Sequence, residues 1–227
     1  MGRGWFVAGT DTGVGKTRAA CALLAAAVQA GRRAVGMKPV ASGCRATPVG
    51  LRSDDALALI EAANVVADYA DVNPYTFEPA VAPHLAARDL GVIIRLDVIR
   101  ASFAQLATRA DYIVVEGAGG WMTPISEEHT MAAVASVLEL PVVLVVGMRL
   151  GCLNQALLSQ AAIEKSGLVF AGWIANLIDP AMQRVDDNVA TLEKSLNAPL
   201  LAVFPHTVQA LSLPIVGKLT KWIVNSD

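Results

Sequence analysis

The sequence predicts an α/β fold in which a mostly parallel sheet is covered by helices on both faces, and three observations support this prediction. Apolar runs of strand length recur along the chain. Alanine-rich segments of helical period separate most of them, and a glycine-rich turn follows the first run. Strands that are buried on both faces of a parallel sheet are apolar throughout, and helices usually connect them.

The predicted strands and helices alternate over most of the chain. Six apolar runs are predicted to be strands: residues 5–8, 34–37, 112–115, 142–146, 169–174 and 200–204. Four segments between them are predicted to be helices: residues 19–29, 132–138, 154–165 and 185–196. A chain of 227 residues suits one well-buried domain, so we interpret residues 1–227 as a single domain.

One long segment, residues 39–95, departs from this alternation. It contains five prolines and one clear helical pattern, residues 53–63, which Ser53 can cap. In α/β proteins, long connections at the carboxyl ends of parallel strands are where ligands bind. We therefore expect this insertion to form a wall of the active site.

The composition argues against several classes of protein. Hydrophobic residues make up 54% of the chain, but no run reaches the roughly 18 apolar residues of a membrane-spanning helix. With 18 basic and 20 acidic side chains, a nucleic-acid partner is not expected. The first strand begins near the N-terminus without a leader pattern, and the widely spaced Cys21, Cys44 and Cys152 suggest free thiols. A cytoplasmic location is therefore expected.

The strongest motif is the glycine-rich turn from Gly9 to Thr17, with the sequence GTDTGVGKT. It lies between a predicted strand and a predicted helix, which is the context of a phosphate-binding loop, or P-loop. In such a loop, backbone N–H groups bind the phosphates, Lys16 contacts the β and γ oxygens, and the Thr17 hydroxyl ligates Mg²⁺. Thr10 stands where glycine is usual, so the alternative is a plain strand-to-helix turn. The motif predicts a P-loop NTPase-like fold.

Charged residues stand at the ends of two other predicted strands. Lys38 follows the second strand, and Glu116 ends the third strand before a glycine-rich turn at residues 117–120. A carboxylate at that point matches the strand-end acid that holds Mg²⁺ in P-loop enzymes. Asp54 and Asp55 open the helix of the insertion. Each of these residues also has a plain alternative, as a solvated charge or as an acid that favours the helix dipole.

Two further segments are candidate ligand contacts. Residues 147–154 follow the fourth predicted strand and open a helix, so their free N–H groups can hold an anion. Within that segment we interpret Cys152 as a small apolar filler, because no histidine is recognisable as its partner. Asn176 follows the fifth predicted strand and can offer its amide to a purine edge, although asparagine also suits turns.

Together, five blocks of the sequence resemble dethiobiotin synthetases: GTDTGVGKT at 9–17, KPVASG at 38–43, NPYTF at 73–77, VEGAGGW at 115–121 and LGCLN at 150–154. The resemblance covers residues 5 to about 205. This family uses ATP and Mg²⁺ to join CO₂ to the diamine 7,8-diaminononanoate, closing a cyclic urea in biotin synthesis. The resemblance implies that activity, with ATP as co-substrate, and a homodimer whose partner subunit completes each active site.

The resemblance also implies roles for particular residues. Lys16 and Lys38 would flank the transferring phosphate as catalytic groups. Thr17, Asp55 and Glu116 would surround Mg²⁺. Nucleotide contacts are implied for Thr12, Gly13, Val14, Gly15, Lys16, Thr17, Asp55, Glu116, Gly117, Ala118, Gly119, Asn176, Pro205, His206 and Thr207. Substrate contacts are implied for Thr12, Ser42, Gly119 and, from the helix start, Gly151, Cys152, Leu153 and Asn154.

The chain departs from related sequences at three places. Gly13 stands where family members can carry glutamate, and residues 208–227 match no part of the family pattern. Asp11 stands where partition and nitrogenase-type ATPases carry a second lysine inside the loop, and Lys38 can supply that charge from outside it. The alternative function is a nucleotide-switch ATPase of that type. A cobyrinate-type amidotransferase is a further alternative, but its glutaminase domain would not fit in 227 residues.

Overall fold

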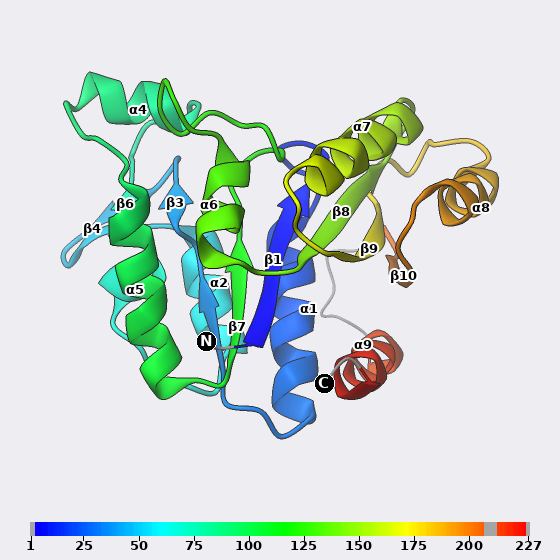
Figure 1. The fold of residues 1–227 in the computed structure, drawn as a ribbon, viewed down its shortest axis with the longest axis horizontal. Helices are drawn as coiled ribbons and strands as arrows, with labels where there is room; N and C mark the ends of the chain where they lie inside the picture. The colour runs from blue at the N-terminus through cyan, green and yellow to red at the C-terminus, as the bar shows by residue number, and fades with distance from the viewer. Residues whose placement is uncertain (1–2, 207–212, 226–227) are drawn as a thin grey trace.

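The computed structural model describes residues 3–206 and 213–225, and its centre is a six-stranded sheet (Figure 1). The strand order is β10-β9-β8-β1-β7-β2, and every neighbouring pair is parallel. The strands are β1 (Arg3–Gly9), β2 (Ala34–Met37), β7 (Tyr112–Glu116), β8 (Val142–Met148), β9 (Phe170–Leu177) and β10 (Leu200–Phe204). The predicted fold class and all six predicted strands are confirmed, with ends shifted by up to three residues.

Helices cover both faces of this sheet (Figure 1). They are α1 (Lys16–Gln29), α2 (Asp54–Ala62), α3 (Tyr69–Val72), α4 (Pro83–Asp89), α5 (Leu96–Arg109), α6 (Met131–Leu138), α7 (Cys152–Lys165), α8 (Val185–Ser195) and α9 (Leu213–Asn225). The five helices expected from the sequence all form, and Ser53 caps α2 by accepting from the Ala56 N–H at 3.4 Å.

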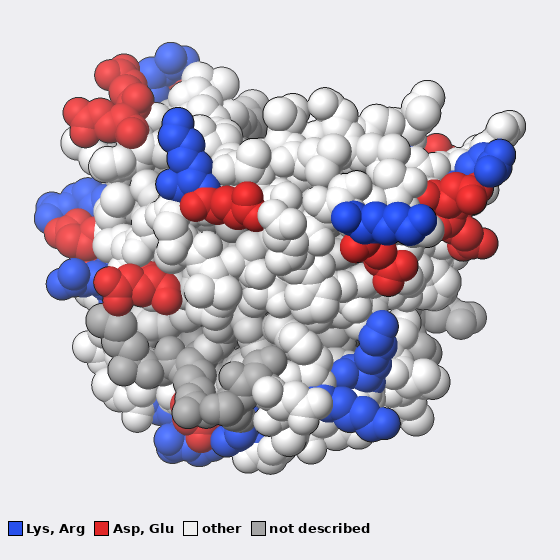
Figure 2. Space-filling view, turned by 45° about the vertical axis from the view of Figure 1, so that its right-hand side comes forward, with Lys and Arg blue, Asp and Glu red and all other residues white. Residues whose placement is uncertain are grey.

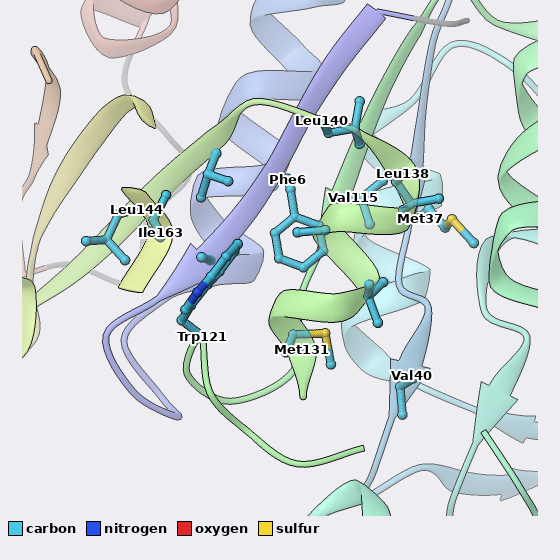
Figure 3. Packing of buried hydrophobic residues seen from close by; sticks show 14 of the residues in the cluster. Phe6, Met37, Val40, Val115, Trp121, Met131, Leu138, Leu140, Leu144 and Ile163 are labelled. Atoms are coloured by element: carbon cyan, nitrogen blue, oxygen red, sulfur yellow. The ribbon is translucent and has the colours of Figure 1, made fainter. Parts of the chain in front are cut away.

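Alternate residues of β1 belong to two separate hydrophobic clusters, one on each face. Phe6 lies with residues of α5, α6 and α7, and in Figure 3 it lies above Trp121 and Met131. Trp5 and Val7 pack on the other face with α1 and α9. The buried side of α1 is rich in alanine, which lets the helix backbone approach the sheet closely. A short loop connects the end of β1 to the start of α1.

The insertion at residues 39–95 folds against the carboxyl-end edge of the sheet. Two short strands, β3 (Val40–Ala41) and β6 (Tyr75–Thr76), pair in parallel, and a hairpin joins β4 (Arg45–Thr47) to β5 (Gly50–Arg52). The helices α2, α3 and α4 complete the segment. None of the four short strands was predicted, because two or three residues give no periodic pattern.

Two long helices were also absent from the sequence prediction. The apolar residues on the buried side of α5 are Ile99, Phe103 and Leu106, which have helical spacing but are separated by polar and charged residues. The helix α9 lies within the divergent tail and packs on α1 through Leu219 and Ile223. The remaining tail residues, 208–212 and 226–227, lie outside the described part of the chain.

Several bulk expectations can be compared with the structure. All three cysteines are free, as predicted. Among the described residues, no helix has the length and apolar character needed to cross a membrane. On the face shown in Figure 2, acidic and basic side chains occur in small mixed groups.

Candidate active site

The carboxyl ends of β1, β2 and β7 converge on one cavity of about 740 Å³. Because these strands are parallel neighbours, residues that follow them in the sequence meet at the same edge of the sheet. The cavity is lined by Thr12, Gly13, Gly15, Lys16, Thr17, Lys38, Ala41, Ser42, Asp55, Ala80, Val81, Ala82, Pro83, Glu116, Ala118, Gly119, Thr123 and Pro124.

The P-loop joins β1 to α1, and its geometry depends on glycine at position 15. Gly15 caps α1 with a left-handed φ of 90°. A Cβ at this position would lie 2.2 Å from Nδ2 of Asn176, so a larger residue would displace the asparagine. Asn176 Nδ2 in turn donates to the Val14 carbonyl at 2.9 Å. The loop is therefore braced from β9, and the N-terminus of α1 faces the cavity.

Lys16 is the buried cation of this loop. Its Nζ donates to the backbone oxygen of Asp11 at 2.9 Å, which folds the side chain back over the loop. Burial, followed by the nearby charge of Lys38, lowers the pKa of Lys16 to about 8. An anion in the cavity would oppose both effects, because a nearby negative charge favours the protonated form of a lysine.

Two carboxylates meet at the Thr17 hydroxyl. Thr17 Oγ1 lies 2.8 Å from Asp55 Oδ1 and 2.9 Å from Glu116 Oε1, and its single hydrogen can be donated to one of them at a time. The second oxygen of Glu116, Oε2, is buried without a hydrogen-bond partner. Burial raises the pKa of Glu116 against the attraction of Lys38.

The two carboxylates share the ammonium group of Lys38. Lys38 Nζ lies 2.6 Å from Glu116 Oε1 and 2.7 Å from Asp55 Oδ2, and it is 3.3 Å from the Gly117 carbonyl. Burial by itself lowers the pKa of Lys38, but the two carboxylates outweigh it and raise that pKa above its ordinary value. Burial also opposes ionisation of Asp55, yet Lys38 leaves the pKa of Asp55 below its ordinary value.

This arrangement fits a hard divalent cation. Mg²⁺ is usually held by one or two carboxylates together with water and substrate phosphates, and a P-loop hydroxyl is a common further ligand. Thr17, Asp55 and Glu116 supply those oxygens, and the unpartnered Oε2 is an acceptor with nothing else to bind. The described residues contain no group of three His, Cys, Asp or Glu side chains suited to a metal.

The opposite wall of the cavity comes from the insertion and from the turn after β7. Ser42 Oγ is buried there without a partner, and Ala118 and Gly119 line the cavity. Gly119 has a φ of 62°, and a Cβ would lie 2.3 Å from Thr123 Oγ1. The prediction that the insertion forms a wall of the site is confirmed, but residues 80–83 were not singled out, because their only sequence signal is Pro83 at the start of α4.

The helix start from Gly151 to Asn154 lies outside this cavity within the described chain. Gly151 caps α7 with a φ of 96° and is exposed. The Cys152 N–H already donates to the Arg149 carbonyl at 3.0 Å, and the Cys152 side chain is fully buried in the core. The predicted carboxylate contacts therefore do not line the P-loop cavity of the same chain, although the neighbouring Arg149 pairs with Asp11 of the P-loop.

The purine-side candidates lie at the ends of β9 and β10. Asn176 is buried beside the P-loop, whereas Pro205 and His206 are exposed. His206 Nδ1 lies 3.1 Å from the Leu177 carbonyl. Thr207 was also predicted to contact the nucleotide, but it lies outside the described residues.

The fold and this edge of the sheet define a P-loop nucleotide-binding protein. Two solved structures share the fold at low identity. MinD from Pyrococcus horikoshii, a septum site-determining protein complexed with Mg-ADP, has a TM-score of 0.62 at 16% identity, covering 98% of this chain and 96% of that one. Cobyrinic acid a,c-diamide synthase from Mycobacterium smegmatis has a TM-score of 0.58 at 17% identity, covering 98% and 92%.

Sequence comparison gives the family. Residues 3–211 match the model of an AAA domain. The ATP-dependent dethiobiotin synthetase BioD of Xanthomonas euvesicatoria is 52% identical over 88% of this chain and 90% of its own. That of Pseudomonas paraeruginosa is 51% identical over 91% of each chain. The chain belongs to the dethiobiotin synthetase family.

Proposed function

We propose that this chain uses ATP to join CO₂ to 7,8-diaminononanoate and close the cyclic urea of dethiobiotin. The observation that carries the proposal is the position of Lys38, which reaches the P-loop cavity from the end of β2 beside Lys16. Two cations on one cavity can neutralise a phosphate and a carbamate together. The ATP-dependent dethiobiotin synthetases at about half identity support the same reaction.

The reaction needs positioning and charge neutralisation rather than a protein nucleophile. One amine of the substrate combines with CO₂ to give a carbamate and a proton. A carbamate oxygen then attacks the γ-phosphorus of ATP, and ADP leaves. The second amine attacks the carbonyl carbon of the mixed anhydride, and phosphate leaves with that oxygen. In this scheme Lys16 and Lys38 hold the γ-phosphoryl group, and the backbone from Thr12 to Thr17 holds the triphosphate.

We infer that Thr17, Asp55 and Glu116 hold Mg²⁺ in the working enzyme. The cation would supply charge neutralisation at the β and γ oxygens of the bound triphosphate. Lys38 binds both carboxylates, at 2.6 Å and 2.7 Å. Its ammonium group would therefore stand beside the bound metal and, because Lys38 lines the cavity, it could contact the carbamate.

The substrate side of the proposal rests on Ser42 and the turn at residues 117–119. Among the described residues Ser42 Oγ has no hydrogen-bond partner, which suits a contact to a substrate amine or to the carbamate. Gly119 and Thr12 lie on the same cavity, so an extended diamine can run between the two walls.

We further propose that the enzyme is a cytoplasmic homodimer in which α7 of one subunit completes the site of the other. Leu150 at the start of α7 is 96% exposed, and Leu157 and Leu158 are also exposed. A groove of about 370 Å³ connects Leu158 to Asp11 of the P-loop. A second copy seated on α7 would therefore lie beside the nucleotide site, with its own α7 start near the substrate. The three free thiols support the cytoplasmic location.

A mixed dimer tests the shared site. Lys16→Ala disables the P-loop, and Asn154→Asp places a negative charge where the substrate carboxylate is proposed to bind. In a mixed dimer, one site combines the intact P-loop of the second variant with the intact α7 of the first. Activity should therefore reappear on mixing, to a level above either parent variant. Mixed dimers that form but remain inactive would place each site within a single chain.

The function itself is tested by co-substrate dependence. ADP release should require both 7,8-diaminononanoate and bicarbonate, and dethiobiotin should form in equal amount to ADP. A nucleotide-switch ATPase would instead release ADP without the diamine. Steady ADP release that ignores both co-substrates would contradict the proposed reaction.

A further inference from the structure

Arg18 links the first turn of α1 to the ends of β9 and β10. Its Nη1 donates to Asn176 Oδ1 at 3.2 Å and to the Pro205 carbonyl at 2.8 Å. The guanidinium carbon lies 5.1 Å from the centre of the Phe204 ring, a distance at which a cation is attracted to an aromatic face. Arg18 is therefore held by three groups from the adjacent ends of β9 and β10: Asn176, Phe204 and Pro205.

These acceptors lie at the edge of the nucleotide site. Asn176 bonds to Val14 of the P-loop and packs against Gly15. Lys16 and Thr17 direct their side chains toward the cavity that holds Asp55 and Glu116. Arg18 follows them on the helix, so its side chain leaves from a different side and contacts β9 and β10 instead.

Two oxygens that converge on a single nitrogen form a binding site for an amine. The exocyclic amine at C6 of adenine has two N–H groups and could be held by this pair. The guanidinium of Arg18 binds both oxygens through an N–H donor, as the amine would. The guanidinium is also planar, as an aminopurine edge is. The arginine side chain has no hydrogen-bond acceptor. An adenine C6 amine would therefore find both oxygens already bound to Arg18, and it would face N–H groups with which it cannot form a hydrogen bond. The C6 carbonyl oxygen of a 6-oxopurine, in contrast, could accept a hydrogen bond from Arg18.

We propose that Arg18 is a specificity-determining residue of the nucleotide base site, lowering the preference for 6-aminopurines over 6-oxopurines. The inference rests on the proposed nucleotide site and adds a residue that the P-loop motif does not include. A charge-assisted hydrogen bond is worth about a factor of ten in affinity, so one residue is enough to change the ranking of two purines.

The experiment compares Mg-ATP with Mg-ITP, which differ at the C6 substituent. Binding is measured by calorimetry on the full chain and on Arg18→Met, which keeps the aliphatic stem but removes every donor. We expect the parent to bind the two nucleotides within roughly 3-fold of each other. In Arg18→Met the ratio of ITP to ATP dissociation constants should rise by roughly 10-fold, because the freed acceptors favour the amine and oppose the carbonyl.

A matched control is Arg33→Met, which removes an exposed arginine whose side chain pairs with Asp111. Its binding ratio should equal that of the parent, and both variants should melt near the parent temperature. A ratio in Arg18→Met within twofold of the parent would overturn the inference about Arg18 while leaving the nucleotide site in place. Failure of the parent to bind either nucleotide would overturn the inference together with the proposed function.

Discussion

Lys38 and Glu116 form a buried ion pair across neighbouring strands, with Nζ 2.6 Å from Oε1 and side chains that are 5% and 1% exposed. The two residues stand 78 positions apart in the sequence but directly follow or end β2 and β7, which pair in parallel. Because a buried charge without a partner is costly, each side chain fixes the place of the other.

Removing one partner should therefore destabilise the metal-free protein. Lys38→Met leaves Glu116 buried without its cation and should lower the free energy of unfolding by about 3–5 kcal/mol. The double variant Lys38→Met with Glu116→Gln should recover most of that loss, because the fully buried carboxylate is then neutral and Asp55, the other partner of Lys38, is partly exposed, while turnover stays low. Urea unfolding without Mg²⁺ measures both effects. Equal stability of Lys38→Met and the parent would mean that the pair is solvated.

Lys16 should matter for turnover and little for folding. Its burial is unfavourable, as the lowered pKa of about 8 indicates, so Lys16→Ala should leave the melting temperature close to that of the parent. Turnover should fall by roughly 10²-fold or more, the scale for losing one preorganised charge-stabilising group. Near-normal turnover in a folded Lys16→Ala protein would contradict the P-loop assignment.

The two carboxylates beside Thr17 should set the Mg²⁺ requirement. Glu116→Gln and Asp55→Asn keep the shape of each side chain but remove the charge that a hard cation needs, so both should shift Mg²⁺ activation to higher concentration. Asp54→Asn is the matched control, because Asp54 opens the same helix turn but pairs with Arg45 at an exposed position. Identical Mg²⁺ curves for all three variants would place the metal elsewhere.

The P-loop glycines should differ in their tolerance of a side chain. Both Gly13 and Gly15 have positive φ, 73° and 90°, so alanine is strained at either position. At Gly13 nothing lies within 4 Å of an added Cβ, whereas at Gly15 it would meet Asn176 at 2.2 Å. Nucleotide affinity should therefore fall much further in Gly15→Ala than in Gly13→Ala. Calorimetric titration of both variants with Mg-ATP measures the difference, and equal losses would contradict the bracing role of Asn176.

The sequence was sufficient to predict the six strands of the sheet and to single out the charged residues that the structure brings together at one edge. The six apolar runs indicate strands that are buried on both faces. Parallel pairing then brings the residues that follow β1, β2 and β7 to the same edge of the sheet. The position of Lys38 against Glu116 then follows from strand order. The P-loop motif adds the start of α1, so Lys16 and Thr17 could be placed before any coordinates.

The apolar wall and the purine side were less predictable, for physical reasons. Residues 80–83 line the cavity through short apolar side chains that carry no chemical signature. The contacts of Arg18 depend on where β9 and β10 end relative to α1, which the sequence pattern does not specify. The helix α9 could not be related to a family pattern, although its buried residues have helical spacing.

The fate of one oxygen atom tests the proposed reaction most directly. The enzyme is incubated briefly with Mg-ATP, 7,8-diaminononanoate and CO₂ labelled with oxygen-18 in unlabelled water, and the released phosphate is examined by mass spectrometry. If a carbamate oxygen attacks the γ-phosphorus, each phosphate should carry one oxygen from the labelled CO₂, and its release should depend on the diamine. Phosphate that takes its new oxygen from water would contradict this account, because the protein would then act as an ATPase and not as a synthetase.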